Sequence, residues 1–572
     1  MKKFLIGLVA GLALAFLFLL GLVLAAGFVQ EPRPRVARGS TLVLDLEGEA
    51  PERPPMTFPI PRLAAEAPAT MQEIWTLLDR ARADDRIEAL VLRPRGLDAG
   101  WGKLQQIRES ILAFKSSGKP VFAYLRSPGA REYYLAATAD KIFLAREDLL
   151  NVKGLRIEAM YLGGTLDKIG VQAEIEHAGK YKDAGDMYSR RSMSPETREV
   201  LDSVLDLLYA EYVEAVAESR NLPVNEVKAA LDEGPFLAQQ ALALRLVDDL
   251  IFEDEMYSRV AQHLSQDEVT KILHGKYLKA TEGAGAGAAR VAYLVGSGTI
   301  LRGAGGGGFG DDGALYAASF IKLVREIKED DRVAGVILRI DSPGGDAIAS
   351  DEILHEIQQL RAAKPLVISM SDVAASGGYY IAMTGDPVIA YEGTITGSIG
   401  VIYGKFNLKG LYDKLGVQKE ILTRGRFADI DSDYTPLTDA SRRKLQEGVH
   451  AVYDRFLTVV SEGRDRSREE VEAVAEGRAW LGSQARDNGL IDEIGGLDRA
   501  LELLRERAGL GPDEPVNLVA YPKRRSLLEY LMERSNEQVL AARLRKLFGG
   551  VDVELLGAGG YLRLLPYSLE IK

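Results

Sequence analysis

Apolar residues follow two patterns along this chain: short continuous runs of strand length, and longer stretches with apolar residues at helical spacing. The two patterns alternate in the same order in both halves. Short, mostly apolar runs such as residues 334–340 have the length of strands buried on both faces. Between such runs, apolar residues recur at helical spacing, so that Phe320, Val324 and Ile327 would share one face of a helix over 314–328. Buried strands that alternate with amphipathic helices are typical of layered proteins, and the pattern therefore predicts the α/β class.

The same reasoning predicts a set of elements in each half. In the first half we expect strands at 41–46, 87–93 and 120–125, helices at 71–82 and 104–114, and a long helix at 197–219. In the second half we expect strands at 290–295, 334–340, 365–370 and 388–391, helices at 314–328 and 351–360, a short helix from 376 and a long helix at 440–462.

An offset of 246 positions aligns the two halves, which indicates a tandem duplication. Tyr133-Tyr134 falls on Tyr379-Tyr380, and residues 167–171 fall on 413–417. The expected boundaries are 1–30 for an N-terminal membrane anchor, 40–275 for the first repeat, 276–290 for a flexible Gly/Ala linker, 291–510 for the second repeat and 511–572 for a C-terminal extension.

The N-terminus predicts a membrane-spanning segment. After Lys2 and Lys3, residues 4–29 are almost wholly apolar and carry no charge, and a span needs about 20 such residues. The apolar part of a cleaved signal peptide is shorter, about 7 to 15 residues, although residues 23–25 could form a weak cleavage site. The length favours an uncleaved anchor, and the two lysines favour a chain whose remainder lies outside the cytoplasm.

Composition narrows the possible chemistry. The chain has 572 residues and a net charge of −12, which argues against a general nucleic-acid binder because phosphate contacts need clustered Lys and Arg. It has no cysteine, so disulfides, thiolate metal sites and a cysteine nucleophile are excluded. The five histidines are scattered, and none lies in a metal-ligand pair such as H-E-x-x-H. We expect neither a metal nor another cofactor.

Each half carries one member of a possible Ser/Lys pair. Ser376 precedes Gly377-Gly378 at the expected start of a helix, and the repeat places Ala130 opposite this serine. Lys182 lies in a basic turn, and Ala428 is opposite this lysine. The complementarity suggests one active site formed between two copies. A helix N-terminus favours an anionic transition state, and a lysine can act as the base when its surroundings favour the neutral amine.

Simpler interpretations stay open at this point. Ser376 could be only the N-cap of its helix, and a lysine in a basic turn is commonly a solvated surface residue. Lys180 competes with Lys182 as the base, although the other copy keeps a cation, Arg426, at the equivalent position. The segment 341–345 (Asp-Ser-Pro-Gly-Gly) follows a buried strand, and its amides could stabilise an oxyanion or form an ordinary turn.

Several motifs together carry a family resemblance. In the second half they are 341–345, 375–380 (Ala-Ser-Gly-Gly-Tyr-Tyr) and 393–400 (Gly-Thr-Ile-Thr-Gly-Ser-Ile-Gly). In the first half they are 179–182 (Gly-Lys-Tyr-Lys) and 193–195 (Met-Ser-Pro). With these motifs the chain resembles the long, two-repeat form of the signal peptide peptidase A family, also called protease IV. The resemblance covers nearly everything from about residue 40 to the tail, and the anchor as well.

The resemblance implies a serine protease with a Ser/Lys dyad on tandem crotonase/caseinolytic-protease-like domains. Ser376 maps to the nucleophile, Lys182 to the general base and Ser398 to the hydroxyl that orients the lysine. The amides of Gly345 and Gly377 map to the oxyanion hole. The family also implies a homotetramer, anchored by one span in the bacterial cytoplasmic (inner) membrane with its catalytic part outside the cytoplasm. Its expected substrates are cleaved signal peptides and other apolar peptides, with no nucleic-acid partner.

Two other functions remain possible. A crotonase-type acyl-CoA enzyme would share the fold and a backbone oxyanion hole, but such enzymes usually need a glutamate acid/base and no anchor. A non-enzymatic scaffold at the membrane would not need Ser376 at all.

Overall fold

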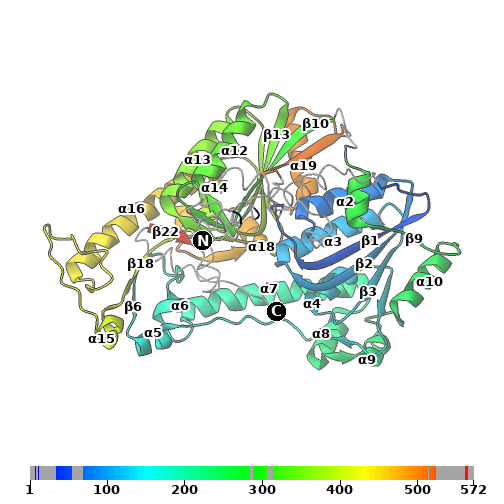
Figure 1. The fold of residues 1–572 in the computed structure, drawn as a ribbon, viewed down its shortest axis with the longest axis horizontal. Helices are drawn as coiled ribbons and strands as arrows, with labels where there is room; N and C mark the ends of the chain where they lie inside the picture. Colours follow the sequence, from blue (N-terminus) through cyan, green and yellow to red (C-terminus); the bar gives the residue numbers. More distant parts are fainter. Residues whose placement is uncertain are drawn as a thin grey trace.

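The computed structural model describes residues 7, 11, 34–54, 68–283, 288–305, 313–512, 514–523 and 561–564. Over these residues, one eight-stranded sheet, two six-stranded sheets, one two-stranded sheet and the helices around them place the protein in the α/β class, as the sequence predicted (Figure 1). The expected anchor over residues 4–29 lies outside the described residues, apart from Gly7 and Gly11. Within the described part of the chain, no helix is both long and apolar enough to cross a membrane.

The first sheet belongs to the N-terminal half and is wholly parallel, in the order β8-β4-β3-β2-β1-β9. Its strands are β1 (Ser40–Glu49), β2 (Ile87–Asp98), β3 (Val121–Leu125), β4 (Lys141–Leu144), β8 (Asp249–Leu250) and β9 (Thr270–Leu273). Three helices connect β1 to β4, namely α2 (Met71–Ala83), α3 (Trp101–Lys115) and α4 (Ala130–Ala136). The parallel order explains why the strands are apolar on both faces.

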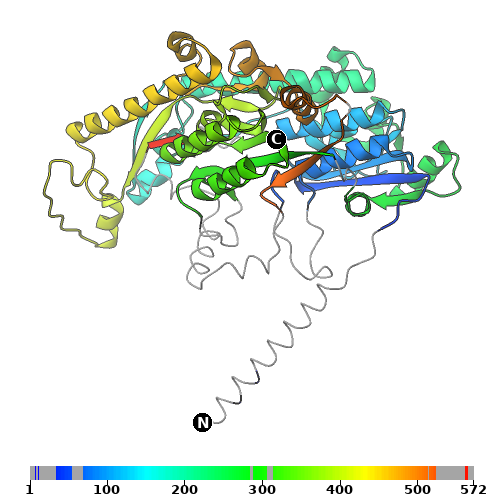
Figure 2. The ribbon, with the colours of Figure 1, turned by 90° about the horizontal axis from the view of Figure 1, so that it is seen from above.

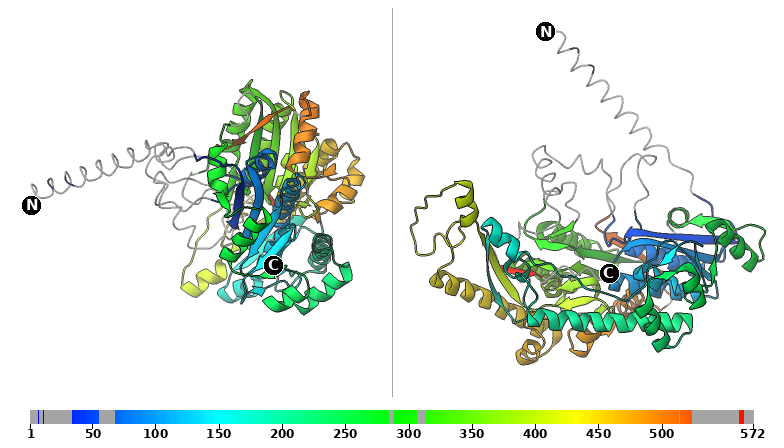
Figure 3. Two further views of the ribbon diagram at one scale, coloured as in Figure 1. Left: turned by 90° about the vertical axis from the view of Figure 1, so that its right-hand side faces the viewer. Right: turned by 90° about the horizontal axis from the view of Figure 1, so that it is seen from below.

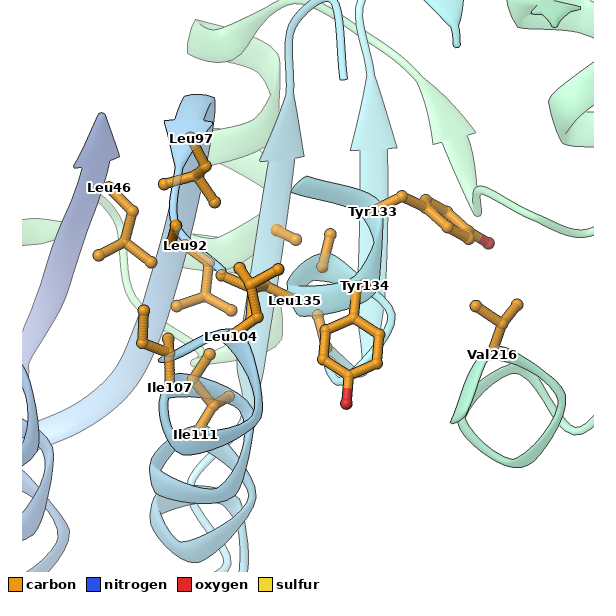
Figure 4. Close-up of a cluster of buried hydrophobic side chains, with 14 of the residues drawn as sticks. Leu46, Leu92, Leu97, Leu104, Ile107, Ile111, Tyr133, Tyr134, Leu135 and Val216 are labelled. Carbon is orange, nitrogen blue, oxygen red and sulfur yellow. The ribbon is translucent and has the colours of Figure 1, made fainter. Parts of the chain in front are cut away.

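The core of this half lies between the sheet and the helices that cover it. Figure 4 shows Leu46 and Leu92 on the strands facing Leu104 and Ile107 on α3, and all four side chains are buried. The apolar residues of α3 recur every three to four positions, so they form the stripe that meets the sheet.

The second sheet belongs to the C-terminal half and follows the order β19-β17-β15-β13-β10-β21, with β16 and β20 attached beside β15. Its strands are β10 (Ala289–Ser297), β13 (Val333–Ser342), β15 (Leu366–Ala375), β16 (Val388–Ala390), β17 (Ile395–Gly397), β19 (Ala479–Leu481), β20 (Glu493–Ile494) and β21 (Val516–Tyr521). Its helices include α12 (Ala317–Glu329), α13 (Ala347–Arg361), α14 (Gly377–Ala382) and α19 (Leu497–Ala508). Of the described pairs, only β17 with β19 is antiparallel.

Helices recur between the halves at the spacing seen in the sequence. The pairs α2 and α12, α3 and α13, and α5 (Gly163–Ile169) and α15 (Lys409–Leu415) all begin and end 246 positions apart. The long helices α7 (Pro195–Arg220) and α16 (Asp439–Arg464) both have 26 residues. Each begins slightly before the expected position because a hydroxyl side chain, from Ser194 or Thr438, accepts a hydrogen bond from the backbone of the first turn.

The third sheet joins the two halves. Its order is β12-β11-β14-β22-β18-β6, and β6 is the strand from the first half. The strands are β6 (Gln172–Ala178), β11 (Thr299–Leu301), β12 (Ala314–Tyr316), β14 (Gly344–Asp346), β18 (Val401–Asn407) and β22 (Tyr561–Leu564). In Figures 1 and 2, β6 leaves the first half and lies beside β18 at the far end of the second half.

The remaining elements are short or peripheral, apart from α7, which runs along both halves (Figure 3). They are β5 (Leu149–Leu150), β7 (Phe236–Leu237), α6 (Asp186–Ser189), α8 (Val224–Glu233), α9 (Ala238–Ala243), α10 (Glu253–His263), α11 (His274–Ala280), α17 (Arg468–Glu472) and α18 (Gly482–Asp487).

A buried ion pair also fixes one half against the other. Arg339 on β13 and Glu52 after β1 are both buried, and two guanidinium nitrogens donate to Glu52 Oε1 at 3.0 and 2.9 Å. Burial alone would raise the pKa of Glu52, but Arg339 and Lys103 hold that pKa below its usual value. A charge pair of this kind tolerates little relative movement, because each ion depends on the other for its solvation.

Candidate active site

The pairing of β6 with β18 carries Lys182 into the second half. The two strands are antiparallel, and Ala178 lies opposite Val401 at the end of the ladder. The chain then turns at Gly179, whose φ of 101° suits glycine, and Lys182 follows three residues later. A Cβ atom at Gly179 would lie 2.4 Å from the carbonyl carbon of Glu476, so the turn packs directly on the second half.

Ser376 stands where β15 ends and α14 begins. Its φ of 54° and ψ of −114° are unusual for a residue with a side chain, and such strain is characteristic of functional positions. Ser376 is the N-cap residue of α14, but its hydroxyl makes no capping hydrogen bond to the helix, so capping does not account for the side chain. The next residues must be small: a Cβ atom at Gly378 would lie 2.4 Å from the carbonyl oxygen of Ser342.

The two residues meet in the interior of the protein. Lys182 Nζ lies 2.8 Å from Ser376 Oγ and also donates to the carbonyl oxygen and the hydroxyl of Ser398, at 2.8 and 2.9 Å. All three residues are at most 1% exposed. The three oxygens are neutral, and burial disfavours the charged form of an amine. The arrangement can therefore transfer a proton from a serine hydroxyl to an amine.

The competing lysine lies elsewhere. Lys180 is exposed, and its Nζ lies 4.6 Å above the centre of the Tyr181 ring. The interaction with Tyr181 raises the pKa of Lys180, which favours the ammonium form. Of the two lysines in this turn, Lys182 is thus the one within hydrogen-bond distance of Ser376.

The glycines expected to stabilise an oxyanion lie beside the serine. Gly345 has a φ of 153°, and a Cβ atom there would lie 2.1 Å from the carbonyl oxygen of Ile300. A Cβ atom at Gly377 would lie 3.1 Å from the amide nitrogen of Gly345, so the two backbones are in contact. Side chains are excluded at both positions, and the amides can approach a substrate carbonyl closely.

The sequence alone did not single out Gly477, and it indicated Gly400 only as the end of the 393–400 motif, without a contact to the lysine. Gly400 and Gly477 form a tight wall around the lysine, and a Cβ atom at these positions would lie 3.0 Å from Lys182 Cδ and 2.5 Å from Lys182 Cβ, respectively. The Gly477 amide donates to the Ile399 carbonyl at 2.7 Å, which holds this turn against Ser398 and Gly400. An isolated Gly-Arg dipeptide far from the other motifs gives no signal in one sequence.

Asp183 anchors the lysine turn to α7. It is buried, and burial raises its pKa to about 6. Its Oδ2 accepts a hydrogen bond from the hydroxyl of Thr197, which lies in the first turn of α7. The turn that carries Lys182 is therefore held at both ends, by β6 before it and by α7 after it. Spacing alone did not single out this aspartate.

Comparison with known proteins identifies the class to which this fold and site belong. The model of peptidase family S49 matches residues 113–267 and 358–511, one segment in each half. The chain is 33% identical to "Serine protease SPPA, chloroplastic" of Arabidopsis thaliana, over 85% of this chain and 72% of that one. It is 31% identical to "Protease 4" of Haemophilus influenzae, over 83% of this chain and 77% of that one. It is 28% identical to "Protease 4" of Salmonella typhi, over 89% of this chain and 84% of that one.

These matches span most of the chain and confirm the resemblance. The protein is a serine protease, and it belongs to peptidase family S49.

Proposed function

We propose that this protein is a membrane-anchored endopeptidase that degrades cleaved signal peptides and other apolar peptides through a Ser/Lys dyad and an acyl-enzyme. The observation that carries the proposal is the 2.8 Å contact between Lys182 Nζ and Ser376 Oγ, made inside the protein by residues from different halves.

In this mechanism, neutral Lys182 takes the proton of Ser376 as the serine oxygen attacks a peptide carbonyl carbon. Ser398 orients the amine, because both its hydroxyl and its carbonyl oxygen accept hydrogen bonds from Nζ. The resulting ammonium then gives the proton to the leaving amine nitrogen, and the peptide bond breaks. Lys182 is neutral again and activates the water that releases the acyl group from Ser376.

The charge that develops on the carbonyl oxygen needs donors that are already in place. The amides of Gly345 and Gly377 are the donors that we propose, because their backbones are in contact and lie beside Ser376. Removal of one donor from an oxyanion hole commonly costs a factor of about 10² to 10³ in rate. The site needs no metal for this chemistry.

The membrane part of the proposal rests on the sequence. Residues 4–29 are long enough to span the bilayer of a bacterial cytoplasmic (inner) membrane, with the catalytic part outside the cytoplasm. An enzyme held there would meet released signal peptides, whose apolar segments remain at the bilayer. A homotetramer is the assembly that we propose from the family resemblance.

The test is labelling by a fluorophosphonate probe, which reacts with an activated serine. We expect the wild type and Lys180→Ala to be labelled, and Ser376→Ala and Lys182→Ala to be unlabelled. Lys180→Ala is the matched control, since it removes a lysine two positions away from the same turn. Loss of labelling in Lys180→Ala alone would make Lys180 the base. A folded wild type that reacts with no probe would refute the dyad, and acyl-CoA binding by it would favour the crotonase-type alternative.

A further inference from the structure

The strand that leads to Ser376 is irregular just before the site. The ladder between β13 and β15 changes register there, so that residues 371–373 of β15 lie opposite Asp341 alone. Extra residues of this kind form a bulge, which bends a strand and redirects the side chains that follow. The bulge ends three residues before Ser376, and Asp341 begins the segment that carries Gly345. The shape of the bulge therefore affects both the nucleophile and the proposed oxyanion hole.

Two aspartates bind the backbone around this bulge. Asp341 Oδ1 accepts a hydrogen bond from the amide of Val373 at 3.2 Å. Asp372 accepts hydrogen bonds from the amides of Gly100 and Lys103, at 2.8 and 2.7 Å. Both amides lie at the start of α3 in the first half, and the free N–H groups of a helix N-terminus suit a carboxylate. An aspartate of the second half thus caps a helix of the first half.

The side chain of Lys103 lies between the two carboxylates. Its Nζ is 2.8 Å from Asp341 Oδ2 and 3.5 Å from Asp372 Oδ2. The three side chains are 13%, 17% and 15% exposed, so water screens their charges poorly. Burial alone would lower the pKa of Lys103, but the two aspartates raise that pKa above its usual value, which favours the ammonium form. Without this ammonium group, two poorly solvated carboxylates would face each other.

The start of α3 fits closely against the bulge where the two halves meet (Figure 1). A Cβ atom at Gly100 would lie 2.5 Å from Asp372 Cγ. A Cβ atom at Gly102 would lie 2.7 Å from the carbonyl oxygen of Ser371. Because the backbone of the helix touches the bulge directly, a movement of the aspartates is passed on to β15 rather than absorbed by loose packing.

The cluster of Lys103, Asp341 and Asp372 has no charge-matched counterpart in the repeat. At the offset of 246 positions, Ala349 replaces the lysine, and Arg95 and Arg126 replace the two aspartates. The three charges therefore follow the same asymmetry as the Ser/Lys pair, and they occur where that pair is formed.

We propose that Lys103 is a positioning residue for the protease reaction. Its ammonium group holds the two aspartates of the bulge together, and the bulge in turn sets the positions of Ser376 and of the Gly345 amide. The first half then contributes a second lysine to the site, one that orders the nucleophile and the oxyanion hole, in addition to the base Lys182. This inference rests on the proposed function, because it concerns the geometry of the same dyad.

The test compares Lys103→Met with Lys115→Met in the full-length chain. Lys115 is the matched control, because it lies at the other end of α3 and also binds an aspartate, Asp140, at 2.9 Å. Fluorophosphonate labelling taken to completion counts the intact sites, so that unfolded protein does not enter kcat per labelled site. Since misplacement by about 1 Å costs on the order of 10²-fold in rate, we expect kcat of Lys103→Met for an apolar peptide to fall by about that factor, with KM changed by less than about threefold. Lys115→Met should match the wild type.

A double variant separates positioning from a general loss of stability. Lys103→Met/Asp341→Asn removes one of the two facing charges and keeps the side-chain oxygen that accepts the Val373 amide. Its kcat should be at least about tenfold above that of Lys103→Met. If Lys103→Met does not fold, Lys103→Gln keeps a donor without the charge, and its kcat should lie between those of the wild type and the double variant or below both.

Two results would overturn the proposal. One is a kcat per labelled site in Lys103→Met, or in Lys103→Gln where that variant takes its place, within about threefold of the wild type. The other is a double variant no faster than the single one. In both cases the wild type would still be labelled at Ser376, whereas failure of the dyad itself would leave the wild type unlabelled.

Discussion

Replacement of Gly477 by alanine should disable the proposed dyad by moving Lys182 rather than by removing it. Gly477 lies in the turn before β19, with a φ of 80°. A Cβ atom there would lie 2.5 Å from Lys182 Cβ, 2.6 Å from its amide nitrogen and 2.7 Å from its Cα. An ordinary contact needs at least 3.4 Å, so one of the two backbones must shift by about 1 Å.

A shift of that size is large compared with the geometry of the dyad. The Nζ–Oγ distance is 2.8 Å, and a movement of about 1 Å would take it beyond hydrogen-bond length. Misplacement by about 1 Å costs on the order of 10²-fold in rate, which corresponds to about 2.7 kcal/mol of transition-state stabilisation. We therefore expect kcat/KM for an apolar peptide, and the rate of fluorophosphonate labelling, to fall at least about 10²-fold.

Gly416→Ala is the control for backbone strain. Gly416 has a φ of 72°, close to that of Gly477, but a Cβ atom there would meet nothing within 4 Å. Both variants pay the same cost of a left-handed alanine, about 1 to 2 kcal/mol in stability. Only Gly477→Ala also crowds the lysine. If urea unfolding shows both variants to be folded and their labelling rates agree within twofold, the wall around Lys182 has no part in positioning the base.

Two further predictions concern buried charged groups. Arg339→Met should lower the free energy of unfolding by about 3 to 5 kcal/mol in urea titrations, because Glu52 would remain buried without its cation. Arg332→Met removes the exposed arginine of another ion pair and should change the free energy of unfolding far less. Equal effects of the two substitutions would contradict the argument. Glu211 lies on α7 and accepts a hydrogen bond from the hydroxyl of Tyr134, and burial raises its pKa from 4.5 to about 7. The protonated form is thus favoured in the folded protein, and stability should fall by about 3 kcal/mol as pH rises through that interval. Other buried carboxyls, such as Asp183, also lose stability in this range, so Glu211→Gln should reduce the pH dependence by about this amount rather than abolish it; a variant with the full wild-type dependence would exclude Glu211 as a contributor.

The layered α/β architecture could be predicted from the sequence because local patterns determine it. The strands predicted at 334–340 and 365–370 occur as β13 and β15, both longer at their C-terminal ends. Those extra residues are 341–342 (Asp-Ser) and 371–375 (Ser-Asp-Val-Ala-Ala), in which polar and small side chains replace the large apolar ones. The pattern therefore loses its signal at the ends of the strands, which is where the site is built.

The pairing of β6 with β18 could not be predicted in the same way. The alternation in residues 172–178 indicates a strand but carries no information about which strand it joins. The pairing is fixed by tertiary contacts, in particular by the close approach of Gly179 to Glu476. The Ser/Lys pair was nevertheless visible in the sequence, because each partner had an alanine as its counterpart in the other repeat.

The difference between the two repeats, in which each partner of the Ser/Lys pair has an alanine as its counterpart, explains why the duplicated chain has the elements for one Ser/Lys site rather than two. The positions equivalent to β18 and β6 in the opposite copies are 155–161 and 418–424, and neither segment forms a strand. In segment 418–424, Leu422 is 94% exposed, so the apolar residues of this segment do not pack on a sheet. Ala130 and Ala428 occupy the positions where a second dyad would need a serine and a lysine. Once the serine or the lysine of a second pair was lost, no function would maintain the other residue of that pair. The strand pairing and both residues of the proposed dyad are absent together from the opposite positions, as expected if the β6–β18 ladder serves to bring Lys182 to Ser376.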